Sequence, residues 1–377
     1  MKFRVERDVL AEAVTWVARG LPTRPPVPVL AGVLLEAADD GTLTLSAFDY
    51  EVSARVTVTA EVTEAGTVLV LGRLLADISR NLPGKPVDVL AEGNKVQVTC
   101  GSSRFALLQM PAEEYPTLPT APEGSGTIDG TTFTQAVQQV GIAADRGDTL
   151  PILTGVRVEV EGERITLLAT DRYRLAMREL EWSPQASDAS HVALIPARTL
   201  TETARSLGAA GSIDVAFGGA AGGDGLVGFE AGQRRTTSRL LDGEYPKVAK
   251  IFPTSSETEA VIDTHALTEA VKRVALVAER NTPVRLRFSG GQVAIEAGTG
   301  DDAQASEAVE ASVQGPDIEV AFNPGYLLDG LGVLGTTCTR MSFTAPLKPA
   351  MITGQESPDA ELDTSYRYVL QPVRLAG

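Results

Sequence analysis

The sequence predicts an α+β fold made of three tandem repeats of one domain, each with two helices and a mainly antiparallel sheet. Three stretches, 3–24, 127–146 and 261–280, begin alike with a short apolar strand, a polar turn and an amphipathic helix. Each is followed by residues that alternate between apolar and polar, which is typical of antiparallel hairpins. A second strand–helix unit comes next in every repeat. Because a half-buried sheet needs helices to cover it, each repeat can form its own core.

The first helix of each repeat is predicted from apolar residues that recur every three or four positions. Such a stripe places its side chains on one helix face, toward the sheet. The stripes contain Leu10, Val14 and Val17 in the first repeat and Leu267, Val271, Val274 and Val277 in the third.

The hairpins after these helices are predicted from turn signals between alternating strands. The signals are DDG at 39–41, EGE at 161–163 and SGG at 289–291. Gly and Asp favour tight turns because they tolerate unusual backbone angles.

The second strand–helix units begin at Val68, Val192 and Ile318. The repeat spacing is roughly 125 residues, far longer than the 20–50 residues of solenoid repeats, so each repeat is a whole domain. Segments rich in Pro, Gly and Ser separate the repeats. We therefore predict domains at residues 1–120, 126–253 and 257–377.

The composition of the 377 residues is that of a globular protein, with 43% hydrophobic residues. No apolar run approaches the roughly 20 residues that a membrane span requires. The first ten residues, MKFRVERDVL, lack the apolar region of a secretory signal. We therefore expect a cytoplasmic protein.

Cysteine, histidine and glycine motifs offer no cofactor or metal chemistry. Cys100 and Cys338 are too few for a disulfide framework or a zinc site, and His191 and His265 each stand alone. The sequence has no phosphate-binding GxxxxGK[ST] loop and no GxSxG nucleophile elbow. We expect no cofactor, no metal and no catalytic site.

The formal net charge is −16, which by itself argues against a nucleic-acid partner. However, arginines lie seven residues apart, on one helix face, in the second helices of two repeats. These pairs are Arg73 with Arg80 and Arg198 with Arg205, and further arginines at the ends of first helices are Arg19, Arg24, Arg146 and Arg280. They are either ordinary solvated residues or a shared surface for a polyanion. With 5% aromatic residues, backbone contact fits better than base stacking.

The stretch 170–175, TDRYRL, concentrates polar groups around Asp171. A carboxylate-dependent hydrolase would use Asp171 with Arg174, but no second acid or metal ligand set is near it in the sequence. The first repeat has Asp49 at the matching place, and a repeated Asp at a strand end favours a turn.

The final segment, YVLQPVRLAG at 368–377, is apolar where chain ends are usually polar. We predict that Tyr368, Val369 and Leu370 close a sheet. Pro372 cannot donate a ladder hydrogen bond and should turn the remaining residues toward a groove.

Six motifs in order carry a resemblance to a known family: MKFRVER, RPPVPVLAGVLLEA, LPILTGVRVEV, ATDRYRLA, LLDGEYPKVAKIFP and PVRL. Together they resemble the bacterial DNA polymerase sliding clamps, the replicase beta subunits, over essentially the whole chain. The alanine, glycine and acidic bias resembles actinobacterial members.

The resemblance implies a non-enzymatic processivity factor of DNA replication. Two chains would form a head-to-tail homodimer, a six-domain ring around duplex DNA with helices lining the hole. The ring would tether the replicative polymerase, the clamp loader, other polymerases and repair proteins through short clamp-binding peptides, on nucleoid DNA. An acidic exterior and a basic hole would also reconcile the net charge with DNA contact.

The resemblance further assigns site residues. The eight arginines named above would face DNA. The dimer interface would use Phe105 and Leu107 of one chain against Leu276 and Val277 of the other, although these four residues also fit an internal core. The partner-peptide pocket would comprise Leu153, Thr170, Arg172, Tyr173, Arg174, Leu175, Pro246, Lys250, Ile251, Val369, Gln371, Pro372, Val373, Arg374 and Leu375.

Two positions depart from the family pattern: Gln371 stands where Met is common, and Arg172 where many members carry Gly. An amide needs hydrogen bonds where a thioether adapts its shape. One alternative is therefore a paralogous clamp whose altered pocket escapes an inhibitory peptide. Another is a tandem scaffold without a DNA role, which predicts no segregation of charge.

Overall fold

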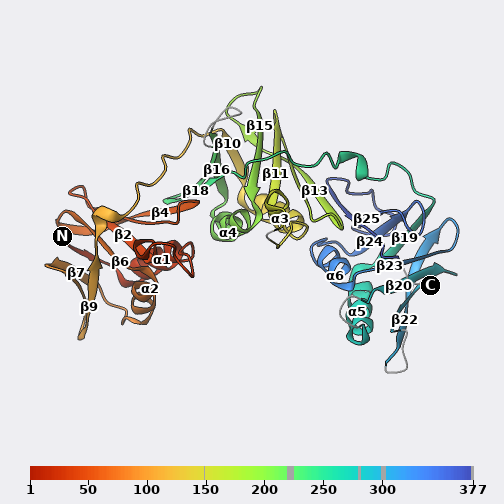
Figure 1. Cartoon of the computed structure of the whole chain (residues 1–377), viewed down its shortest axis with the longest axis horizontal. Coiled ribbons are helices and arrows are strands. Elements are labelled where there is room, and N and C mark those ends of the chain that lie inside the picture. Colours follow the sequence, from red (N-terminus) through yellow and green to blue (C-terminus); the bar gives the residue numbers. More distant parts are fainter. Residues whose placement is uncertain (148, 219–224, 279–281, 299–302, 375–377) are drawn as a thin grey trace. The chain divides into compact units, whose positions relative to one another are not determined.

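The computed structural model of the chain describes residues 1–147, 149–218, 225–278, 282–298 and 303–374 (Figure 1). They form two compact units. Unit 1 contains residues 1–131, 183–187 and 202–240, and unit 2 contains residues 132–182, 188–201 and 241–377.

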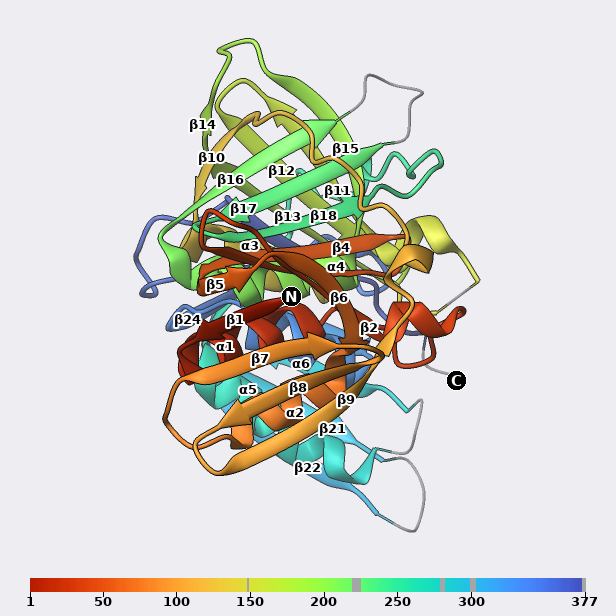
Figure 2. The same ribbon diagram turned by 90° about the vertical axis from the view of Figure 1, so that its left-hand side faces the viewer.

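Unit 1 is built on one antiparallel sheet, which has 14 strands among the described residues. The strands are β1 (Lys2–Val5), β2 (Gly32–Ala37), β3 (Thr42–Phe48), β4 (Val52–Thr59), β5 (Glu61–Glu64), β6 (Gly66–Leu71), β7 (Val87–Glu92), β8 (Lys95–Cys100), β9 (Ser103–Met110), β10 (Gly126–Asp129), β14 (Ser183–Pro184), β16 (Ser212–Gly218), β17 (Leu226–Ala231) and β18 (Arg234–Arg239). Their order is β14-β10-β16-β17-β18-β4-β3-β2-β6-β9-β8-β7-β1-β5. Figure 2 shows β7, β8 and β9 side by side.

Unit 2 has a second antiparallel sheet, with 12 strands in the described part of the chain. They are β11 (Gly155–Glu161), β12 (Arg164–Thr170), β13 (Arg174–Glu181), β15 (Ser190–Pro196), β19 (Thr258–Asp263), β20 (Val284–Ser289), β21 (Gln292–Ala297), β22 (Ala305–Gln314), β23 (Ile318–Phe322), β24 (Cys338–Phe343), β25 (Ala350–Gln355) and β26 (Tyr366–Leu370). Their order is β15-β11-β12-β13-β26-β25-β24-β19-β22-β21-β20-β23.

The helices follow the expected pattern of two per repeat. The described residues form α1 (Arg7–Ala18), α2 (Gly72–Asn81), α3 (Gly130–Gly141), α4 (Ala197–Leu207), α5 (Thr264–Val274) and α6 (Pro324–Gly332). In unit 1, α1 lies beside α2 (Figure 1) and packs against β3 and β4. In unit 2, α5 packs against α6 and against β21 and β22. The α+β class with antiparallel sheets is confirmed.

The apolar stripes form the inner helix faces, with one exception. Leu10, Val14, Val17, Leu267, Val271 and Val274 are all buried. Val277 is only half-buried because α5 ends at Val274 and residues Ala275–Val277 form a single 3-10 turn. A change from 3.6 to 3 residues per turn rotates the following side chains away from the stripe.

The predicted turns join adjacent antiparallel strands: β2 with β3, β11 with β12, and β20 with β21. Gly41 and Gly162 have φ angles of 83° and 57° at two of these turns. A side chain at such φ values is disfavoured, so glycine is the residue that the turn needs.

The last strand, β26, lies inside the sheet of unit 2. It pairs with β13 on one side, where Val369 faces Leu175, and with β25 on the other, where Val369 faces Met351. The residues predicted to close a sheet therefore do so, and they join a strand of the second repeat to one of the third.

Two further observations concern membrane-spanning helices and the two cysteines. No described helix combines the length and the apolar character that crossing a membrane would demand. Cys100 and Cys338 are both free and buried.

The contact between α6 and β26 leads to a stability prediction. A Cβ at Gly330 would lie 2.4 Å from the Tyr368 ring, whereas a Cβ at Gly332 in the same helix would meet no atom within 4 Å. Overpacking costs about 1–3 kcal/mol and alanine returns about 1 kcal/mol of helix propensity. We expect Gly330→Ala to lower the free energy of unfolding by up to about 2 kcal/mol and Gly332→Ala to raise it slightly, measured by urea denaturation. Equal effects of the two changes would contradict this packing.

Candidate partner-binding site and basic helix faces

The turn between β12 and β13 is organised by Asp171, which is buried. Its Oδ1 accepts hydrogen bonds from the backbone N–H groups of Tyr173 and Arg174, both at 3.0 Å. Its Oδ2 accepts from Arg174 Nε at 2.9 Å. A carboxylate with these three bonds is a structural acceptor, which supports the turn hypothesis over catalysis.

The first repeat contains the same turn. Asp49 Oδ1 accepts from the backbone N–H groups of Glu51 at 3.0 Å and Val52 at 2.7 Å. The residue after each Asp has a left-handed backbone, with φ of 76° at Tyr50 and 79° at Arg172. That conformation costs a non-glycine residue about 1–2 kcal/mol. It explains why glycine suits the position that Arg172 occupies.

A buried tyrosine accepts a hydrogen bond from the strand that leads into each turn. The hydroxyl of Tyr115 accepts from the Phe48 N–H at 2.8 Å, and that of Tyr245 accepts from the Thr170 N–H at 3.0 Å. Burial raises the pKa of both Tyr115 and Tyr245 to about 12. Each hydroxyl therefore stays neutral and keeps its strand end in place.

Arg174 lies beneath the second turn, with only 4% of its side chain exposed. Besides the bond to Asp171, its Nη1 donates to Asp329 Oδ2 of α6 at 2.7 Å. Its guanidinium lies 4.3 Å from the ring of Tyr326, which in turn stacks on Tyr173 with centroids 6.2 Å apart. These contacts fix the turn to α6 and hold the Tyr173 ring in place.

An apolar cluster adjoins this network. Leu175, Val248 and Val369 are buried together, and the partly buried Leu168, Phe252 and Met351 pack against them. Leu153 lies in a neighbouring cluster with Leu194 and Tyr245. Leu168 packs against both clusters and so connects them.

The C-terminal tail, Gln371–Arg374, extends from β26 along this surface. The Gln371 N–H donates to the carbonyl oxygen of Tyr173 at 2.9 Å, and the Val373 N–H donates to that of Ala321 at 2.8 Å. Pro372 is buried between them. The Gln371 side-chain amide donates to the carbonyl oxygen of Leu347 at 3.4 Å.

The structure therefore brings most of the predicted pocket residues to one region of unit 2. Thr170, Arg174, Leu175, Val369 and Pro372 form its buried part. The exposed part consists of Arg172, Tyr173, Pro246, Lys250, Ile251, Gln371, Val373 and Arg374. Leu375 lies outside the described residues.

Sequence reasoning missed several members of this site. Tyr326 and Asp329 lie on α6, Met351 lies on β25, and Leu347 lies in the loop before β25. The available signals were the polar spacing of Tyr326 and Asp329 on a helix otherwise rich in glycine and leucine, and the position of Val248 within the motif LLDGEYPKVAKIFP.

The helix arginines are exposed at every described position. Arg73 donates from Nη2 to the carbonyl oxygen of Leu21 at 3.0 Å. Arg80 pairs with Asp77, and Arg205 pairs with Glu202 at 3.4 Å.

The remaining helix arginines differ in their partners. Arg146 lies 4.0 Å from Asp329. In the described part of the chain, no ion pair involves Arg19, Arg24 or Arg198. Arg280 lies outside the described residues.

The four predicted interface residues differ in exposure, and Val277 is half-buried. Phe105 and Leu276 are 41% and 84% exposed. Leu107 is 3% exposed in the single chain, whereas its neighbour Leu108 is 68% exposed, and the interface role of Leu107 stays a prediction. Adjacent residues of a strand face opposite sides, so Leu107 and Leu108 point to opposite faces of β9, whereas Phe105 lies on the same face as Leu107 and is more exposed.

Among the described residues, two stretches of strand near these positions pair on one side only. In β9, Ser103–Leu108 pair with β8 alone, since β6 reaches only Gln109 and Met110. In β22, Ala305–Glu310 pair with β21 alone, since β19 reaches only residues 311–314. An open edge presents unpaired N–H and C=O groups to a further strand.

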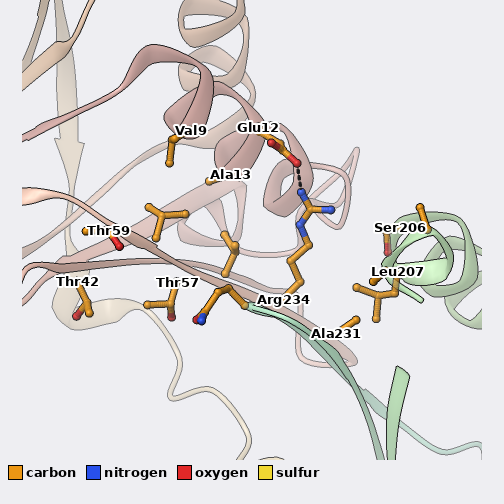
Figure 3. A pocket seen from close by; sticks show the side chains of 15 residues that line it. Val9, Glu12, Ala13, Thr42, Thr57, Thr59, Ser206, Leu207, Ala231 and Arg234 are labelled. Atoms are coloured by element: carbon orange, nitrogen blue, oxygen red, sulfur yellow. Dashed lines mark hydrogen bonds and ion pairs between the residues drawn. The ribbon is translucent and has the colours of Figure 1, made fainter. Parts of the chain in front are cut away.

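Unit 1 also contains a hollow of about 630 Å³ between α1, β4 and β18 (Figure 3). Arg234 crosses it to form an ion pair with Glu12 of α1, and its guanidinium lies 5.7 Å from the Trp16 ring. The ion pair closes part of the hollow. No predicted site residue lines it.

Comparisons with known proteins agree with this architecture. Three family models match, the N-terminal, central and C-terminal domains of the DNA polymerase III beta subunit, at residues 1–119, 127–247 and 249–367. The chain belongs to the DNA polymerase III beta subunit family, the sliding clamps. Members of this family are processivity factors without intrinsic catalytic activity.

Individual relatives support the assignment. The chain is 58% identical to the beta sliding clamp of Streptomyces coelicolor over 377 residues, all of both chains. It is 47% identical to the beta sliding clamp homolog GriR of Streptomyces muensis, over 99% of each. The crystal structure of the sliding clamp from Bacillus subtilis matches with a TM-score of 0.92 at 28% identity, over 100% of both chains.

The buried tyrosines lead to a pH prediction. Because their pKa rises from 10.0 to about 12 on folding, their contribution is fully present below pH 10 and is lost as the pH rises to 12. Each should contribute roughly 2–3 kcal/mol to that loss. Tyr245→Phe should lower stability by about 1 kcal/mol at neutral pH, through the lost hydrogen bond, yet flatten the decline above pH 10. Urea midpoints between pH 8 and 12 would measure this, with the exposed Tyr50→Phe as control, and an unchanged slope would refute it.

Proposed function

We propose that two copies of this chain form a head-to-tail ring around duplex DNA and tether the replicative polymerase and other DNA-processing proteins to it. Membership of the sliding-clamp family supports this, as do the exposed arginines on α2 and α4. The single observation that carries the DNA role is the clustering of exposed arginines on helices of a protein with net charge −16. Contacts to phosphates carry no base information, so such a ring can move along any sequence.

The division into domains at 1–120, 126–253 and 257–377 belongs to the same proposal. It is supported by the ranges of the three matching family models. From the family we also propose that the protein works in the cytoplasm, on nucleoid DNA.

The dimer contact is proposed at the two open sheet edges. The free edge of β9 in one chain would pair with the free edge of β22 in the other, with Phe105 and Leu276 among the apolar side chains covered. Such a heterologous contact closes into a ring when two copies complete the rotation.

The partner-peptide pocket is proposed at the apolar cluster and the tail. Apolar walls with a few polar groups at the rim suit an extended peptide with apolar side chains. The clamp of Pseudomonas aeruginosa has been solved bound to griselimycin, and this chain matches that structure with a TM-score of 0.91 at 29% identity.

A paralogous clamp that escapes an inhibitor is the alternative. It rests on Gln371 and on the 47% identity to the GriR homolog. The higher identity of 58% to a beta sliding clamp favours the main function.

Topology provides the direct test of a ring. The protein, loaded by a clamp loader, should remain on nicked circular DNA through gel filtration and leave after the circle is linearised. Retention after linearisation would indicate ordinary binding, and no retention on the circle would contradict the ring.

The basic helix faces provide a second prediction. Replacing Arg73, Arg80, Arg198 and Arg205 by Ala should weaken DNA association and reduce its salt slope by about 0.9 for each arginine that contacts phosphate. A charge-matched control replaces four exposed strand arginines, Arg4, Arg55, Arg164 and Arg287. DNA affinity would be measured against salt by fluorescence anisotropy, with dimer mass checked by light scattering. Equal losses in both variants would attribute the effect to net charge alone.

A further inference from the structure

Large apolar side chains are exposed around the apolar cluster, each next in sequence to a basic residue. At the turn after β12, Tyr173 is 54% exposed and follows the exposed Arg172. In the 3-10 turn at Ala249–Ile251, Ile251 is 45% exposed and follows the exposed Lys250.

The same pairing occurs on two more segments. In the tail, Val373 is 36% exposed and precedes the exposed Arg374. In the loop before β25, Leu347 is 55% exposed and precedes the exposed Lys348. Neither Leu347 nor Lys348 belongs to the expected pocket.

Contacts place these four segments at one surface. Gln371 connects two of them to the tail, through its N–H to the Tyr173 carbonyl at 2.9 Å and its side-chain amide to the Leu347 carbonyl at 3.4 Å. The Ile251 N–H donates to the carbonyl of Val248 at 2.9 Å, and Val248 packs against Val369. The tail begins at Gln371, two residues after Val369.

Among the residues that the structure describes, the four cations at this surface lack a carboxylate counter-ion. Across the described ranges, neither a hydrogen bond nor an ion pair from a carboxylate reaches the side chains of Arg172, Lys250, Lys348 or Arg374. The adjacent Asp171 is buried and occupied by Arg174. The chain has 49 acidic and 33 basic residues, so this group of exposed cations differs in sign from the net charge of the protein.

We infer that this surface selects partner peptides in which acidic residues alternate with apolar ones, an inference that rests on the proposed peptide pocket. In an extended peptide, successive side chains point to opposite sides. Apolar side chains can then enter the cluster while carboxylates reach the neighbouring cations. Charge complementarity of this kind gives specificity and a faster on-rate more than raw affinity.

The test compares two fluorescein-labelled peptides, one with four Glu-Leu repeats and an isosteric one with four Gln-Leu repeats. With the full-length dimer at about 0.05 M salt, the glutamate peptide should bind about tenfold more tightly than the glutamine peptide, by fluorescence anisotropy. At about 1 M salt the two affinities should converge, because charges are screened over about 3 Å.

Single variants assign the effect to the surface. Lys348→Gln, outside the expected pocket, should weaken the glutamate peptide about two- to fivefold and leave the glutamine peptide unchanged. Lys250→Gln, within the pocket, should weaken the glutamate peptide more than the glutamine peptide. Lys95→Gln, at an exposed lysine of β8 in unit 1, is the matched control and should change neither.

Three outcomes would overturn the inference. Equal affinity of the two peptides would remove the acidic preference while leaving the pocket in place. Binding of neither peptide would also contradict the proposed pocket. In the third outcome, a short DNA duplex displaces the glutamate peptide from the wild-type protein and from Lys95→Gln but not from Lys348→Gln. That result would assign the surface to nucleic acid.

Discussion

The arrangement of unit 2 depends on the backbone ladder that β26 forms with β13 and β25. Tyr366–Leu370 pair with β13, and Tyr368–Leu370 also pair with β25, so this strand cannot slide without breaking bonds on two sides. A shift of one residue would also turn Val369 away from the apolar cluster. The ladder thereby fixes the point at which Gln371 leaves the sheet and meets the carbonyl of Tyr173. The tail, the cluster and the loop at Leu347 all take their positions from that point.

A buried charge then ties this sheet to α6. Arg174 is almost fully buried, and a guanidinium in that position must be compensated because desolvation of an ion costs several kcal/mol. Asp171 supplies one carboxylate from its own turn, and Asp329 supplies the other from a helix of the third repeat. Removing either acid would leave a partly unpaired buried charge, so the turn and α6 are held together. The stacking of Tyr173 on Tyr326 is a consequence of the same contact.

The sequence was informative wherever a structural feature is local. Stripes such as Leu10, Val14 and Val17 and the turn at Gly162 depend on neighbours a few residues away, and both were predictable. Pairings between distant segments were not. The ladder of β18 with β4 and the bond from Arg174 to Asp329 join residues more than 150 positions apart, and no periodic pattern encodes them.

Register was the other feature that the sequence could not specify. Leu107 and Leu108 are equally apolar, and the strand's alternation allows either to face inward until the pairing with β8 is known. The end of α5 posed the same problem for Val277. The candidate site was accessible mainly because the motifs around Asp171 and in the tail resemble a family. Its members from α6 and from the loop at Leu347 became evident only with the tertiary contacts.

The distribution of charge supports loose contact with DNA. Arg80 and Arg205 each pair with an acid three residues earlier in the same helix. Exposed pairs of this kind contribute about 0–1 kcal/mol, so a phosphate can replace the carboxylate at little cost and be released as easily. Beyond the roughly 8 Å screening length at physiological salt, the net charge of −16 repels DNA only weakly. In the proposed ring, such replaceable cations within an acidic protein would favour an association that closure of the ring maintains and that permits movement along the duplex.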